Sequence, residues 1–188
     1  MESKNSKKDF KHESILNLAT ELLALKPAAT LQEIADYSNI GIATLHRHFS
    51  NRDALLDELA MNATGLVKEA FQKLQLDPLD AATSLKNLFD LMIPLGNKIS
   101  FLGTTYAHIN KDVVEEEKRL QEPILNFIKE CQKNGQLIND LSAKWILEVI
   151  YNLLFVGWQE IRLGNIAKND ASEILLRTVL SGFLKLRG

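Results

Sequence analysis

The chain has 188 residues, of which 46% are hydrophobic and 24% charged, and its formal net charge is −2; this composition is typical of a globular protein. The polar, Lys-rich N-terminus lacks the apolar core of a secretory signal peptide, and no apolar run reaches the length of a membrane span. The single cysteine, Cys131, excludes an internal disulfide framework. We therefore expect a cytoplasmic protein with no membrane partner.

A first helix is expected over residues 10–25, where apolar residues recur at spacings of three and four. Its inward stripe comprises Ile15, Leu18, Ala19 and Leu22. The polar residues before it and at its start include Lys4, Lys7, Lys8 and Lys11. We interpret this lysine-rich segment as a solvated, disordered terminus.

A second helix is expected to begin at Thr30. Thr30 is a good N-cap, and Glu33 follows three residues later, which is the capping-box pattern. Leu31, Ile34 and Ala35 then lie on one side of the helix. This pattern predicts a short amphipathic helix that packs against a core.

A tight turn should follow near Ser38 and Asn39, because Asn tolerates the left-handed backbone conformation that a sharp turn requires. Ile40 would fill the space between the second helix and the next. Gly41 is an acceptable N-cap for a third helix over residues 42–49. Two short helices joined in this way form the layout of a helix-turn-helix DNA reader.

The third helix has two predicted faces. Leu45 and Phe49, four residues apart, should pack inward, which leaves small and basic residues for the other surface. Residues 37–52 contain no Asp or Glu, whereas residues 1–52 as a whole carry seven Lys or Arg against six acidic residues, and residues 53–188 carry fifteen against eighteen. The charge bias is mild, so the motif carries the DNA prediction and charge only supports it.

Small and apolar residues at the start of such a helix can approach base edges, and Thr can also hydrogen-bond to them. Histidine and arginine can donate to phosphates, which fixes position without reading sequence. The residues expected to contact DNA are Thr30, Gln32, Gly41, Ile42, Ala43, Thr44, His46, Arg47, His48 and Arg52. The lysine-rich N-terminus is an alternative DNA arm. The two histidines at positions 46 and 48 point in different directions on a helix, so no metal site is expected.

These motifs resemble those of the TetR family of transcriptional regulators. The resemblance extends from His12 to Leu59 and includes Ile15-Leu16-x-x-Ala19, Leu31-x-x-Ile34-Ala35, Thr44-Leu45-His46-Arg47-His48-Phe49 and Ser50-Asn51-Arg52-Asp53-Ala54-Leu55-Leu56. The chain departs from the usual family pattern at Lys26-Pro27, Asn39, Gly41, Ile42 and His46. Because Ile42 and His46 should lie on the DNA side, the operator sequence cannot be carried over from the family.

The rest of the chain also reads as helix, with no segment that alternates with period two. The expected helices cover about 51–76, 79–93, 98–109, 112–133, 142–163 and 171–186, and Pro123 should kink or split the one that contains it. The predicted fold is all-α. An N-terminal three-helix helix-turn-helix domain, residues 1–52, precedes a larger helical ligand-binding and dimerisation domain, residues 53–188.

The last two helices are apolar on more than one side, which indicates a central core helix or one shared between a core and a partner. The family resemblance implies the second, with a homodimer interface built from both helices. The residues expected there are Ile146, Val149, Ile150, Leu153, Ile174, Leu175, Val179 and Phe183. A purely internal core is the alternative. Two reading heads would recognise a near-palindrome in double-stranded DNA.

The resemblance implies a repressor that a small-molecule effector releases from its operator, with the helix after residue 51 as the lever. The candidate pocket residues are Phe89, Met92, Phe101, Tyr106, His108, Phe127, Asn152 and Phe155. A DNA-binding adaptor whose C-terminal domain binds a protein is the alternative. No arrangement typical of an enzyme, no phosphate-binding Gly-rich loop and no metal-ligand set is evident, so we expect no catalytic activity and no cofactor.

Overall fold

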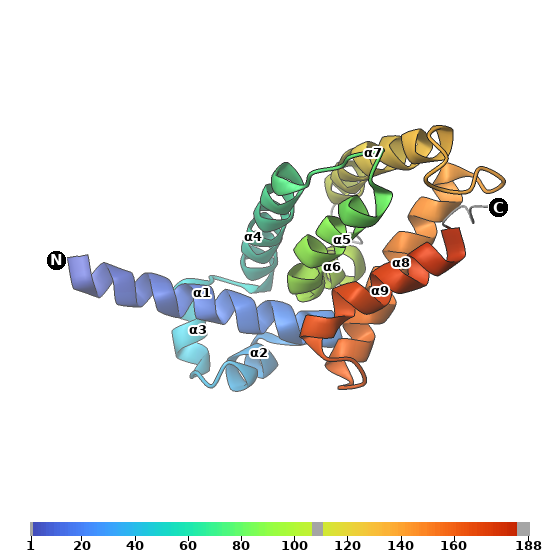
Figure 1. Ribbon diagram of the computed structural model, residues 1–188. Coiled ribbons are helices and arrows are strands. Elements are labelled where there is room, and N and C mark those ends of the chain that lie inside the picture. Colours follow the sequence, from blue (N-terminus) through green and yellow to red (C-terminus); the bar gives the residue numbers. More distant parts are fainter. Residues whose placement is uncertain (1, 107–110, 184–188) are drawn as a thin grey trace. The chain divides into compact units, whose positions relative to one another are not determined.

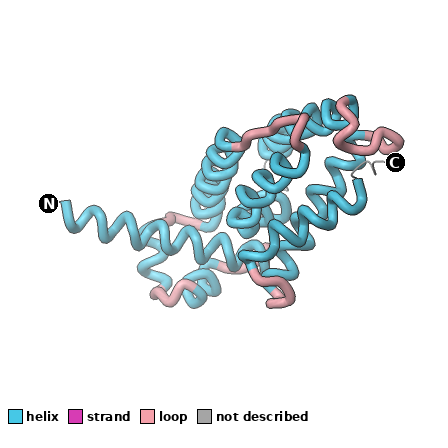
Figure 2. Tube along the Cα trace, viewed as in Figure 1, coloured by secondary structure: helices cyan, strands magenta, loops and turns pink. Residues whose placement is uncertain are grey.

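A computed structural model describes residues 2–106 and 111–183, with side chains described except at 2–10, 104, 106, 111–114, 116 and 117. Within these ranges the chain forms helices and loops and contains no β-strand, which confirms the all-α prediction (Figures 1 and 2). The helices are α1 (Glu2–Leu25), α2 (Leu31–Tyr37), α3 (Ile42–His48), α4 (Arg52–Lys73), α5 (Ala81–Met92), α6 (Gly96–Phe101), α7 (Lys111–Lys133), α8 (Ala143–Arg162) and α9 (Lys168–Phe183). A 3-10 turn, η1 (Ile93–Leu95), precedes α6, and a π-helical turn, η2 (Leu102–Tyr106), follows it.

The chain divides into two compact units, and the first comprises Met1–Leu66 together with Asn97–Val113. Its core is formed by apolar side chains of α1 to α4, and Phe101 from α6 is fully buried in the same cluster. The Thr105 hydroxyl of η2 donates to the Leu23 carbonyl of α1 (3.2 Å). This unit therefore contains the predicted helix-turn-helix and a later segment that packs on α1.

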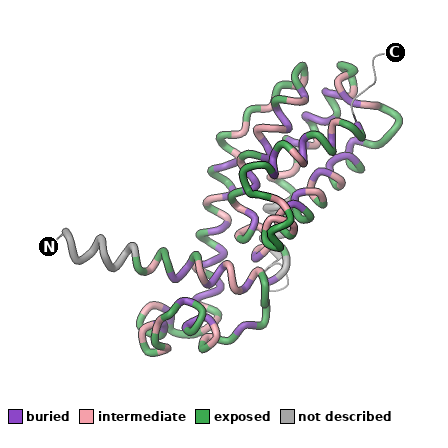
Figure 3. The backbone as a smooth tube through the Cα atoms, turned by 60° about the horizontal axis from the view of Figure 1, so that its bottom comes forward, coloured by how far each residue is buried: buried purple, intermediate pink, exposed green. Residues whose placement is uncertain are grey.

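The second unit comprises Val67–Gly96 and Val114–Gly188. Within it α9 packs against both α5 and α8. Each of these helices buries one side and exposes the other (Figure 3), because apolar residues recur along it at helical spacing. The N-termini of α5 and α8 are capped by the side chains of Asp80 and Ser142, which accept from backbone N–H groups two or three residues into each helix. The predicted functional boundary at residue 52 stays a prediction.

Several predicted helix limits are wrong. The backbone of α1 is helical from Glu2, so the helix includes the segment that the sequence analysis assigned to a disordered terminus. The helix α7 continues through Pro123 without a break. Pro123 is exposed, so water can hydrate the carbonyl that loses its intrahelical donor. The predicted helix over 98–109 is replaced by α6 and η2, and its last residues lie outside the described part of the chain.

Candidate nucleic-acid interface

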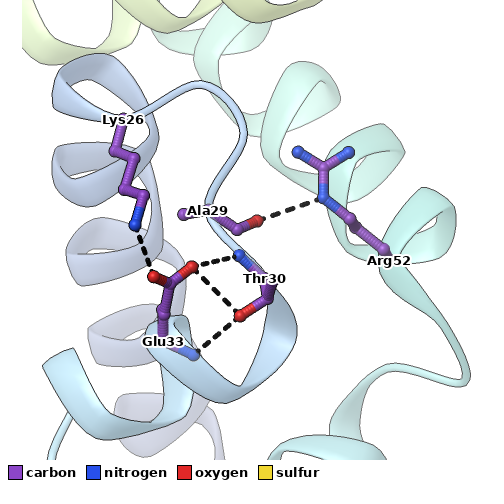
Figure 4. Close-up of polar contacts among 5 residues, drawn as sticks. All are labelled: Lys26, Ala29, Thr30, Glu33 and Arg52. Carbon is purple, nitrogen blue, oxygen red and sulfur yellow. Dashed lines mark hydrogen bonds and ion pairs between the residues drawn. The ribbon is translucent and has the colours of Figure 1, made fainter.

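The N-terminus of α2 is held by three side chains (Figure 4). The Thr30 hydroxyl accepts from the Glu33 backbone N–H (3.2 Å), and the Thr30 N–H donates to Glu33 Oε2 (2.8 Å). Lys26 forms an ion pair with the other carboxylate oxygen of Glu33. The hydrogen bond from Lys26 and those from Thr30 lower the pKa of Glu33 to about 2. The predicted capping box is therefore present, and its carboxylate stays charged far into the acid range.

Arg52, the first residue of α4, braces the loop between α1 and α2. Its Nε donates to the Ala29 carbonyl oxygen (3.2 Å), as Figure 4 shows, and a terminal guanidinium nitrogen donates to the Pro27 carbonyl oxygen (2.8 Å). These bonds satisfy two backbone acceptors that lie outside any helix. A phosphate contact by Arg52 stays a prediction, whereas the structure gives this side chain a role in holding the loop.

The turn between α2 and α3 depends on one residue with a positive φ. Asn39 has φ 51°, and the Ile40 N–H donates to the Ala35 carbonyl (3.0 Å), so the chain reverses as predicted. Gly41 is the N-cap of α3 with φ −68°, and a Cβ at this position would meet no atom within 4 Å. The backbone at Gly41 therefore lies on open surface, where a partner can approach it closely.

The two predicted faces of α3 are present. Leu45 and Phe49 are buried in the core of the first unit. The outer face presents Ala43, His46 and Arg47 as exposed residues and Ile42, Thr44 and His48 as half-buried ones. In the isolated chain the Arg47 guanidinium donates to the Thr44 hydroxyl (2.9 Å), so Arg47 must move before Thr44 and Arg47 can each contact DNA.

The two predicted contact residues on α2 are also exposed. Thr30 lies at its N-terminus, and the Gln32 side-chain amide donates to Asp36 (2.8 Å) one turn further along. All ten predicted DNA contacts thus belong to the same compact unit, on or next to α2 and α3. Contact with DNA stays a prediction for each of them.

One polar cluster behind α3 was missed by the sequence analysis. Nδ1 of His12 on α1 lies 3.1 Å from Nδ1 of His48, the last residue of α3, and Nε2 of His12 pairs with the carboxylate of Glu58 on α4. The His12 ring also stacks on Phe49 with centroids 5.3 Å apart. The members are separated by 36 and 46 positions in the sequence, so no local pattern could have identified them.

The structure does not gather the predicted pocket residues. Phe101 is buried in the first unit, whereas Phe89, Met92 and Phe127 are buried in the second. Phe155 and Asn152 are exposed, and the Asn152 amide donates to a carbonyl of its own helix. The side chain of Tyr106, and all of His108, lie outside the described residues. The predicted set therefore does not line one site, because aromatic residues at helical spacing mostly serve the cores.

The predicted dimer residues need a similar correction. Five of the eight are already buried in the core of one chain and offer no accessible surface: Ile146, Ile150, Leu175, Val179 and Phe183. Val149, Leu153 and Ile174 are half-buried. The accessible apolar residues of α8 are instead Trp145, Phe155 and Val156. The sequence pattern identified apolar helices but could not assign each of their faces.

Two further classes of site were searched among the described residues. No group of three or more His, Cys, Asp or Glu side chains is placed there to hold a metal ion. No helix within the described ranges combines the length and apolar character that crossing a bilayer requires. A helix-turn-helix on an otherwise helical chain defines the class: a DNA-binding regulatory protein.

Comparison with known proteins specifies this class further. A family model described as "Bacterial regulatory proteins, tetR family" matches residues 15–59. The "HTH-type transcriptional regulator NfxB" of Pseudomonas aeruginosa is 25% identical over 160 residues, which cover 84% of this chain and 86% of the relative. The matched residues 15–59 coincide with the core of the first unit and the helix-turn-helix.

Solved structures share the fold along nearly the whole chain. The ketosteroid transcriptional regulator KstR2 of Mycobacterium tuberculosis aligns with a TM-score of 0.75 at 18% identity, covering 93% of this chain and 95% of that one. LfrR of Mycobacterium smegmatis, a TetR-like transcriptional regulator solved in complex with proflavine, aligns with a TM-score of 0.66 at 20% identity, covering 96% and 99%. The chain is a TetR-family transcriptional regulator with a helix-turn-helix DNA-binding domain.

Proposed function

We propose that the chain is a cytoplasmic, homodimeric repressor that binds a near-palindromic operator through α3 of each protomer. A small molecule bound in the second unit would release it. The observation that carries this proposal is the outer face of α3, where Ala43 and Thr44 stand beside the exposed basic residues His46 and Arg47. Small residues next to donors suit base contacts flanked by phosphate contacts.

The dimer is supported by an exposed apolar face on α8. Trp145 and Val156 are 57% and 53% exposed, and they are eleven positions apart, which places them on the same side of a helix. Val149 lies between them on that side. Large apolar side chains in such a row mark an interaction surface, and a second copy of the same helix would cover it symmetrically.

A ligand is supported by an unmet donor inside the second unit. The indole Nε1 of Trp158 is buried and has no hydrogen-bond partner in the structure. An unpaired buried N–H costs free energy that an acceptor on a ligand would recover. The complex of LfrR with proflavine provides a precedent for a planar aromatic ligand in this fold. Such a ligand would act only through its difference in affinity between the DNA-bound and free conformations.

Binding-site selection from a random duplex pool tests the proposal. The full-length protein should recover a motif with two-fold symmetry and half-sites separated by about one helical turn. Adding proflavine to the selected complex then tests release by a planar ligand. Recovery of no motif by a folded, dimeric protein would overturn the proposed operator binding.

A further inference from the structure

The contact between His12 and His48 imposes a rule on protons. Two imidazole nitrogens 3.1 Å apart form a hydrogen bond only if one of them carries hydrogen and the other does not. The two Nδ1 atoms therefore share a single hydrogen. Which ring supplies it depends on what the opposite nitrogen of each ring is doing.

Glu58 settles the matter for His12. An ionised carboxylate only accepts, so Nε2 of His12, which pairs with Glu58, must carry hydrogen. In a neutral His12 the other nitrogen, Nδ1, is then bare and accepts. Consequently a neutral His48 must donate from Nδ1, and its own Nε2 carries a lone pair.

One added proton reverses this arrangement. If it binds to His12, Nδ1 of His12 becomes the donor and His48 takes the tautomer with hydrogen on Nε2. If it binds to His48, both of that ring's nitrogens carry hydrogen. In either case Nε2 of His48 becomes a donor. A second proton would place hydrogens on both Nδ1 atoms and break the bond between the rings.

We propose that Glu58 and His12 are positioning residues that set the tautomer of His48, so that α3 meets a DNA phosphate with an N–H donor only after the histidine pair has taken up one proton. This inference rests on the proposed DNA-binding role of α3. A phosphate interacts favourably with a donor and unfavourably with a lone pair. DNA binding is therefore coupled to uptake of one proton by each reading head.

The surroundings of the pair fit this role. The titratable groups in the described contacts of the pair come one from each helix: His12 from α1, His48 from α3 and Glu58 from α4. Phe49 covers one face of the His12 ring. The side chains of His12 and Glu58 are 28% and 43% exposed, so protons exchange readily with solvent.

The first measurement is nitrogen-15 NMR of the imidazoles in the full-length protein without DNA. Above the titration of the pair, His12 should carry hydrogen on Nε2 and His48 on Nδ1. Below it, Nε2 of His48 should be protonated. A His48 that carries hydrogen on Nε2 throughout the alkaline range would overturn the relay, and this result does not depend on DNA binding.

The second measurement is DNA affinity against pH, using a duplex of about 30 base pairs, long enough for two half-sites about 10 base pairs apart. Where the free pair is neutral, affinity should fall by about tenfold per pH unit for each head. In His12→Asn, the amide can donate from a nitrogen as far from Cα as Nδ1 and does not titrate. In Glu58→Gln, the amide can donate to Nε2 of His12. Both changes set His48 as a donor without added protons, so both should flatten the pH dependence and keep affinity at high pH.

His46→Asn is the matched control, because His46 is an exposed histidine on the same helix outside the pair. It should keep the wild-type pH slope. If His12→Asn and Glu58→Gln bind DNA and keep that slope as well, the relay is wrong while the proposed function stands. If the tautomers are as expected but the protein binds no duplex at any pH, the proposed function is wrong and the DNA part of this inference falls with it.

Discussion

The guanidinium of Arg52 donates from Nε to the carbonyl oxygen of Ala29, so the first residue of α4 is fastened to the last residue before the capping box of α2. A second bond reaches the Pro27 carbonyl. The helix that leads away from the reading head and the helix that begins it are thus joined by one side chain. This contact changes what a substitution of Arg52 should do.

In Arg52→Ala, two backbone carbonyls lose their donors, which should cost about 1–3 kcal/mol of stability to the extent that water cannot replace them. DNA affinity should fall because the loop before α2 loosens, whereas the salt dependence of binding should stay unchanged. Affinity measured against salt concentration separates the two roles. A salt slope that drops by about one would instead show that Arg52 neutralises a phosphate. Arg47→Ala serves as the comparison, since its guanidinium lies on the exposed face of α3.

The exposed face of α8 predicts where the protomers meet. Trp145→Glu combined with Val156→Glu should give monomers in sedimentation, because four carboxylates would be buried in a symmetric interface without partners. Both side chains are exposed in the single chain, so helical content should be kept. Met61→Glu, which changes an exposed apolar residue of α4, is the control and should remain dimeric. A dimer that survives the double change would place the interface on another face.

Local rules predicted much of this molecule. The capping box at Thr30, the left-handed residue at Asn39 and the inward pair Leu45 and Phe49 each depend on residues within a few positions of one another. Such signals are readable in sequence because the chain encodes them one turn at a time. The helix-turn-helix was therefore predicted with nearly correct limits.

Contacts between distant residues could not be predicted in this way. The pairing of His12 with His48 depends on the packing of α1 against α3, and the carbonyls that Arg52 meets come from a loop more than twenty positions earlier. The same limit explains the misassigned interface. Val179 and Trp145 both lie on strongly apolar helices, yet one is buried in the core and the other is exposed. Periodicity shows that a helix has apolar faces and cannot tell which neighbour covers each face.

The capping box predicts a pH dependence of stability. Folding lowers the pKa of Glu33 from 4.5 to about 2, so the folded state favours the charged form. The stabilisation is complete above pH 4.5 and is lost as the pH falls toward 2. Glu33→Gln keeps an acceptor for the Thr30 N–H but not the charge, so its thermal midpoint should approach that of the wild type over this window. Midpoints that stay equally far apart at every pH would contradict the assignment, and Glu13→Gln, at an exposed position on α1, is the control.

Gly96 and Trp158 test the packing of the second unit. A Cβ at Gly96 would lie 2.4 Å from Cδ1 of the Trp158 ring, closer than two carbon atoms can approach. Gly96→Ala should therefore destabilise the protein by about 1–3 kcal/mol through overpacking, although Ala is favoured over Gly in a helix by about 1 kcal/mol. In a Trp158→Leu background the smaller side chain should remove most of this cost. Urea denaturation of the four proteins gives the coupling between the two positions. Additive effects would show that the indole moves aside freely, and that its unpaired Nε1 is not held in place for a ligand.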